Sequence, residues 1–84
     1  MMDYLKKIDE IIEVLIINDM NFEARKIQDI KKNAFTSTEL LLSIGFELNQ
    51  LIKDSKVNEV IGNDVNDLTK YCKKVGLLIS KKPL

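Results

Sequence analysis

Residues 36–52, TSTELLLSIGFELNQLI, carry the strongest signal of fold class in this chain. The segment opens with a capping box: we expect the Thr36 hydroxyl to accept from the Glu39 amide, and the Glu39 carboxylate to accept from the Thr36 amide. Phe35 precedes the cap and is placed to pack against the start of the helix as a hydrophobic staple. The segment therefore predicts a capped central helix over about residues 36–54.

The helix predicted from this segment is apolar on two sides. At about 100° per residue its broad apolar face centres on Ile44, and the other members of that face are Leu40, Leu41, Leu48, Leu51 and Ile52. Leu42 and Phe46 fall nearly opposite. Such a helix is either the central helix of a bundle, covered on both sides, or a helix that keeps one face for a partner.

Helical spacing of apolar residues predicts two helices before this segment. The first covers about residues 3–18, and its apolar stripe consists of Leu5, Ile8, Ile12 and Leu15, widened by Ile11 and Ile16. Asn18 and Asp19 mark a short turn. The second helix covers about residues 21–34, and its apolar residues are Ala24, Ile27, Ile30 and Ala34.

The C-terminal third has two readings. Its apolar residues recur at helical spacing throughout, which suits one long helix: Val57, Ile61, Val65, Leu68, Cys72, Val75 and Ile79. Against this, Gly62 costs about 1 kcal/mol inside a helix and, with Asn63, offers a stop and a re-start. We favour a short helix over residues 56–61 and a longer one over about residues 63–75, ended by Gly76.

Together these elements predict an all-α protein. We expect one small up-and-down bundle of four to five helices, with residues 1–84 as a single helical domain. The last eight residues, LLISKKPL, suggest a short extended piece. Hydrophobic residues make up 45% of the chain and charged residues 31%, which is typical of a globular protein with one modest core.

The sequence indicates a cytoplasmic protein. No apolar run approaches the roughly 20 residues of a membrane span, and Asp3, Asp9 and Glu10 interrupt the N-terminus where a signal peptide would be apolar. The single Cys72 cannot form an internal disulfide, which fits a reducing compartment, and its spacing predicts a core thiol.

The residue inventory argues against an enzyme and against a bound cofactor or metal. The chain has no histidine and one cysteine, and its three glycines are scattered instead of forming a phosphate-binding loop. The oxygen-rich run of residues 63–67 lacks the spacing, the glycine and the glutamate of an EF-hand. Because no nucleophile can be paired with a base, we expect a protein that acts by contact.

Charge is balanced overall but uneven along the chain. Residues 1–23 hold six acids against two lysines, and residues 70–84 hold five lysines and no acid. The basic end either complements a helix dipole as solvated surface or attracts a charged partner. An acidic first helix would repel phosphate, and Arg25 is the only arginine available for base readout. We therefore expect no direct nucleic-acid partner.

Three groups of side chains are candidates for binding another protein. They are Leu42 and Phe46 with Asn49 beside them, the carboxylates Glu59, Asp64 and Asp67, and Glu10 and Glu13 on the first helix. Each group also has a structural reading, as a buried second face, as caps in a solvated loop, or as ordinary surface. The functional reading gives Phe46 the role of an apolar anchor and the carboxylates the role of an acidic surface for a basic protein, such as a nuclease whose cleft binds phosphate.

Four segments in order carry a resemblance to a known class of proteins. They are YLKKIDEIIEVLI, NFEARKIQDIKKNAF, TSTELLLSIGFELNQLI and VIGNDVNDLTKYCKKVGL. This ordering resembles small all-α immunity proteins of bacterial polymorphic-toxin and contact-dependent growth inhibition systems. The resemblance implies a cytosolic protein that binds its cognate toxin domain, often a ribonuclease, and blocks the active site or the approach of substrate.

Two other functions stay open. One is a self-associating structural or regulatory module, in which Leu42 and Phe46 form the contact of a weak homo-oligomer. The other, less favoured, is a nucleic-acid-binding helical domain that uses the C-terminal lysines. These are Lys70, Lys73, Lys74, Lys81 and Lys82.

Overall fold

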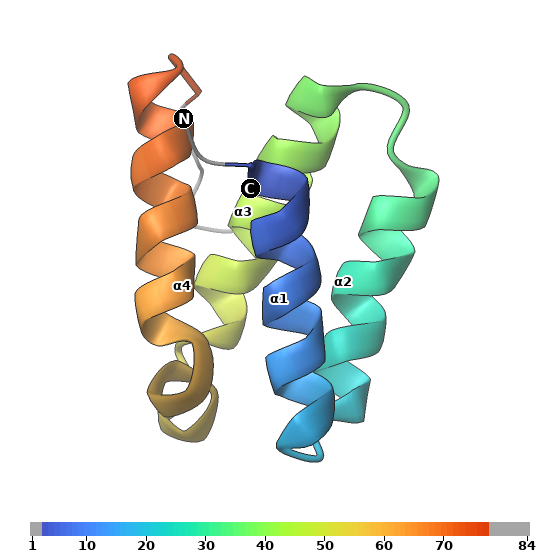
Figure 1. Ribbon diagram of the computed structural model, residues 1–84, viewed down its shortest axis with the longest axis vertical. Helices are drawn as coiled ribbons and strands as arrows, with labels where there is room; N and C mark the ends of the chain where they lie inside the picture. Colours follow the sequence, from blue (N-terminus) through green and yellow to red (C-terminus); the bar gives the residue numbers. More distant parts are fainter. Residues whose placement is uncertain (1–2, 78–84) are drawn as a thin grey trace.

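Residues 3–77, the part of the chain that the computed structural model describes, form four α-helices and no strand (Figure 1). The helices are α1 (Tyr4–Ile17), α2 (Asn21–Asn33), α3 (Ser37–Leu51) and α4 (Ser55–Lys74). The prediction of an all-α chain with four to five helices is confirmed at this level. The extended piece was predicted for residues 77–84, and all of it except Leu77 lies outside the described residues.

The four helices are arranged as a ring. α1 contacts α2 and α4, and α3 contacts the same two helices, whereas α1 and α3 do not pack along each other within residues 3–77. Figure 1 shows successive helices reversing direction, with their connections at alternate ends. α3 therefore lies at a corner of the ring and has two helix neighbours, so it is not enclosed on all sides.

One hydrophobic core fills the ring. Its buried side chains come from all four helices, and no polar or charged side chain of residues 3–77 is buried with them. On α3 the predicted face is confirmed: Ile44 is fully buried, and Leu51 and Ile52 pack against the core as half-buried residues. The other buried members of this face are Leu40, Leu41 and Leu48.

The buried stripe of α1 is narrower than the sequence predicts. It consists of Ile8, Ile11, Ile12 and Leu15. The prediction is wrong for Leu5 and Ile16, which are 43% and 44% exposed. Both lie in the terminal turns of α1 and at the edge of its stripe, where a neighbouring helix covers least.

The N-terminus of α3 is capped by a side chain. The Thr36 hydroxyl accepts from the Glu39 amide at 3.0 Å, as predicted. The Glu39 carboxylate accepts from the amide of Phe35 at 3.3 Å, and the predicted bond from the Thr36 amide is not formed. The hydrophobic staple is also wrong, since Phe35 is 93% exposed. The residue it would pack on, Leu40, turns into the core instead.

α4 is one continuous helix, so the favoured prediction of a break at Gly62 is wrong. Apolar side chains along its whole length are buried, namely Val57, Ile61, Val65, Leu68 and Cys72. A break would turn part of this stripe away from the core, and burial of one such side chain is worth about 1.5–3 kcal/mol. This gain exceeds the cost of about 1 kcal/mol for one glycine inside a helix.

α4 ends where the sequence predicts, just before Gly76. Gly76 has a φ of 89°, a left-handed conformation that glycine adopts without strain. Its amide donates to the Lys73 carbonyl at 3.1 Å, and the Leu77 amide donates to the Cys72 carbonyl at 2.8 Å. These two bonds give hydrogen-bond donors to carbonyl groups at the end of the helix. Cys72 is buried as predicted, and burial raises the pKa of its thiol. It is therefore a core side chain and not a reactive one.

Replacing Thr36 by alanine should remove the cap of α3. We expect the free energy of unfolding to fall by about 1 kcal/mol, because the Glu39 amide loses its acceptor. Thr38→Ala is the matched control in the same turn, and its effect should stay within about 0.5 kcal/mol. Urea unfolding followed by circular dichroism measures both variants. Equal effects would show that the Thr36 hydroxyl contributes nothing.

Alanine at Gly62 should be accepted by a continuous α4. A Cβ added there would clash with Oδ1 of Asn58, the end of an exposed side chain that must turn aside. We therefore expect Gly62→Ala with Asn58→Ala to be more stable than Asn58→Ala alone, by about 0.5–1 kcal/mol. Chemical denaturation of the two variants gives this difference. A loss of stability would contradict an unbroken helix at this position.

Candidate functional site

Three of the predicted acidic residues meet at one surface, Glu10 of α1 with Asp64 and Asp67 of α4. Lys7 Nζ donates to Oδ1 of Asp64 at 3.2 Å and lies 3.8 Å from Oε2 of Glu10. The Lys7 and Asp64 side chains are 19% and 32% exposed, so this ion pair is partly withdrawn from water. We name this surface the α1–α4 seam, formed by Tyr4, Lys7, Glu10, Asp64, Asp67 and Tyr71.

The seam raises the pKa of Lys7 above its ordinary value of 10.5. The largest cause is the hydrogen bond to Asp64; partial desolvation, which comes next, acts in the opposite direction. Attraction to Asp64, Glu10 and Asp67 adds to the rise. Because three carboxylates surround one ammonium group, the seam keeps a net negative charge. Such a surface attracts cationic side chains of a partner.

Two tyrosines extend the seam to one end of the bundle. The rings of Tyr4, in the first turn of α1, and Tyr71, in the last turn of α4, stack with centroids 5.9 Å apart and planes inclined by 25°. The Tyr4 hydroxyl donates to Oγ of Ser37 at 2.9 Å, which ties α1 to the start of α3. Both tyrosines are half-buried, and tyrosine is enriched in protein–protein contacts.

The remaining predicted acids lie apart from the seam. Glu13 on α1 and Glu59 on α4 are exposed, and within residues 3–77 neither forms an ion pair. The structure thus brings together Glu10, Asp64 and Asp67 and leaves the other two acids as separate surface charges.

The predicted apolar pair lies on α3, away from the seam. Leu42 and Phe46 are half-buried, and among the described residues they belong neither to the core nor to the apolar side chains packed against it. Asn49 beside them donates through Nδ2 to the Gly45 carbonyl at 2.8 Å and to Oγ1 of Thr69 at 3.3 Å. Its amide therefore links α3 to α4 within the bundle.

The basic end of the chain is described only in part. Lys70, Lys73 and Lys74 are exposed near the C-terminal end of α4, where positive charge complements the helix dipole. Lys81 and Lys82 lie outside the described residues.

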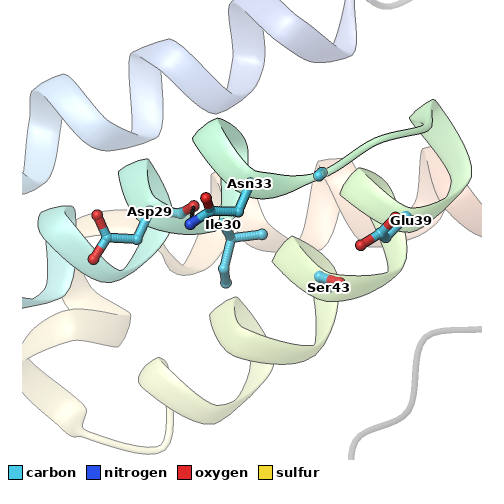
Figure 2. A pocket seen from close by; sticks show the side chains of 6 residues that line it. Asp29, Ile30, Asn33, Glu39 and Ser43 are labelled. Carbon is cyan, nitrogen blue, oxygen red and sulfur yellow. Dashed lines mark hydrogen bonds between the residues drawn. The ribbon is translucent and has the colours of Figure 1, made fainter.

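A shallow pocket of about 260 Å³ lies between α2 and α3 (Figure 2). It is lined by Asp29, Ile30, Asn33, Ala34, Glu39 and Ser43. Figure 2 shows Asp29 and Glu39 at its two ends, with Ile30 pointing between the helices. The pocket thus combines an apolar floor with an acidic rim.

Sequence reasoning missed Lys7, the two tyrosines and this pocket. Lys7 and Glu10 have the three-residue spacing of a helix surface pair, which is a signal present in the sequence. The stack of Tyr4 on Tyr71 and the pocket join different helices, so only the packing of the bundle reveals them.

Residues 3–77 contain no group of three or more metal-binding side chains, and none of their helices is both long and apolar enough to cross a membrane. No protein-family model, no curated protein and no solved structure matches the chain. The described residues offer two surfaces suited to a partner's side chains, the α1–α4 seam and the pocket between α2 and α3.

The raised pKa of Lys7 makes the stabilising effect of its pairing depend on pH. Since the pKa of the folded state lies above the value of the unfolded chain, this stabilisation is fully present below about pH 10.5 and is lost as the pH rises through the folded-state pKa. We expect Lys7→Met to be less stable than the unsubstituted chain near neutral pH, by up to about 1 kcal/mol. The difference should shrink at high pH.

Chemical unfolding at stepped pH values measures this difference. Lys6→Met is the matched control, because Lys6 is exposed and forms no ion pair within residues 3–77. Its effect should not change with pH. A stability difference for Lys7→Met that stays constant up to the highest pH would contradict the raised pKa.

Proposed function

We propose that this chain is an immunity protein that binds a cognate bacterial toxin domain in the cytoplasm and neutralises it by one-to-one contact. We propose a ribonuclease as the toxin. The observation that carries the proposal is the α1–α4 seam, where two helices bring Glu10, Asp64 and Asp67 around Lys7. It adds to the resemblance of the helical segments to small all-α immunity proteins.

The charge of the seam supports this function. A ribonuclease binds phosphate through cationic side chains, so a surface with surplus carboxylates is complementary to its cleft. Tyr4 and Tyr71 add aromatic area at the same surface, and tyrosine is among the residues that most often carry binding energy. A contact of this kind covers the cleft and excludes the substrate without a chemical step.

The proposed contact requires a rigid scaffold. We propose an up-and-down bundle in which the capped α3 forms one wall and presents Phe46 as an apolar anchor, with Leu42 beside it. Glu13 is exposed on α1 and would extend the acidic contact at its edge, whereas Glu59 is exposed on α4 and stays outside this contact. No cofactor takes part in this mechanism.

Co-expression with a toxin tests the proposal. A candidate toxin domain, chosen from the product of the gene directly upstream, is expressed alone and together with this chain, and cell growth is followed. We expect the chain to restore growth, because binding covers the active site of the toxin. Unchanged killing in the presence of the folded chain would overturn the proposal.

Charge reversal tests the role of the seam. Asp67→Lys should raise the Kd for the toxin domain tenfold or more, which corresponds to about 1.4 kcal/mol. Glu59→Lys is the matched control, since it makes the same change at an exposed position of α4 outside the seam. Isothermal titration calorimetry gives both values. Equal weakening by the two substitutions would show that the seam is not the contact.

Self-association is a second candidate function. It is favoured by Leu42 and Phe46, which are half-buried and stay outside the core formed by the described residues. Static light scattering separates the two functions. A stable homodimer that Phe46→Glu dissociates would support self-association, whereas a monomer supports the immunity function.

A further inference from the structure

The pocket between α2 and α3 offers hydrogen-bond acceptors to a ligand. Asn33 already donates through Nδ2 to the Asp29 carbonyl at 2.8 Å, so its side-chain oxygen remains to accept. One oxygen of Glu39 accepts from the Phe35 amide at 3.3 Å, which leaves the other oxygen. The Asp29 carboxylate forms no ion pair within residues 3–77. A ligand that fits this pocket must therefore bring donors.

The electrostatics of the pocket favour a positive charge. Asp29 and Glu39 are acidic, and no residue that lines the pocket is basic. α2 ends at Asn33 and α3 begins at Ser37, so the dipole ends of the two helices oppose each other here, and the charge of the pocket comes from its two carboxylates. Lys31 in the last turn of α2 pairs with Asp9 of α1, so its charge is directed to another side of α2.

The apolar floor of the pocket and its separated acceptors favour an arginine side chain over a lysine side chain. The apolar side chains of Ile30 and Ala34 lie between the two carboxylates, as Figure 2 shows for Ile30. A methylene stem can cover such a floor while a charged head reaches the rim. Arginine has this stem and a planar head with five donors, which can serve acceptors from two helices at once. Lysine brings a compact ammonium group with three donors.

We propose that this pocket receives an arginine side chain of the partner protein, with its guanidinium between Asp29 and Glu39. This inference rests on the proposed function, because it takes the partner to be a basic protein. The pocket lies at the same end of the bundle as the stack of Tyr4 on Tyr71, since Tyr4 bonds Ser37 at the start of α3. Because the α1–α4 and α2–α3 pairs lie on opposite sides of the ring, a partner contacts both by covering this end of the bundle.

A titration with a small arginine compound tests the pocket without any toxin. The ¹⁵N-labelled chain is titrated with N-acetyl-L-arginine amide, and amide shifts are followed by NMR. We expect saturable shifts confined to residues 29–34 and 39–43. N-acetyl-L-citrulline amide has nearly the same shape and no charge, and it should cause no saturable shift. N-acetyl-L-lysine amide should bind at least threefold more weakly than the arginine compound.

Two variants make the test specific. Asp29→Asn removes one carboxylate whose side chain has no partner within residues 3–77, so the fold does not depend on it, and it should weaken arginine binding at least fivefold. Glu59→Gln removes the same charge from an exposed site on α4 and should leave binding unchanged. Unchanged affinity in Asp29→Asn, or equal binding of the citrulline compound, would overturn the inference.

The outcome separates this inference from the proposed function. If the chain protects against the toxin but does not bind the arginine compound, the proposed arginine site is wrong and the immunity function stands. If the chain binds the arginine compound but gives no protection, the arginine site stands and the immunity function is wrong.

Discussion

Four amphipathic helices bury their apolar stripes by sharing a single core, and this requirement governs the molecule. One fully buried isoleucine from each helix belongs to that core, in the order Ile8, Ile27, Ile44 and Ile61. Isolated helices of this length are only marginally stable in water, because nucleation of a helix costs free energy. Tertiary packing of the apolar face supplies most of the stability of such a helix in a protein. The helices, the ring and the core therefore form together.

Polar contacts between the helices surround this core instead of entering it. They are Lys7 with Asp64, Lys31 with Asp9, Asn49 with Thr69, and Tyr4 with Ser37. Each contributes about 1 kcal/mol or less, so they add little to the free energy of folding. Their effect is on geometry, since they relate the helices to one another and bring carboxylates from different helices to shared surfaces. The α1–α4 seam arises in this way, whereas the pocket between α2 and α3 arises from the packing of these two helices.

Local sequence correctly predicted two features that depend on a few consecutive residues. The cap at Thr36 and the stop at Gly76 were correct, because each is made by hydrogen bonds within one turn of a helix. The break at Gly62 was wrong, since its local cost of about 1 kcal/mol is outweighed by burial of the stripe of α4, a gain that no short window shows. The predicted hydrophobic staple of Phe35 was also wrong, because Leu40 is buried in the core and does not pack against Phe35.

The amino-acid pattern alone settled that the chain is helical and which face of each helix is apolar. The periodicity of a helix orients side chains about its own axis and carries no record of how two helices are placed against each other. Lys7 and Asp64 are 57 positions apart, and the pocket joins α2 to α3, so packing of the core brought these groups together. Tertiary structure therefore decided which acidic residues share a surface, because that depends on the relative rotation and position of whole helices.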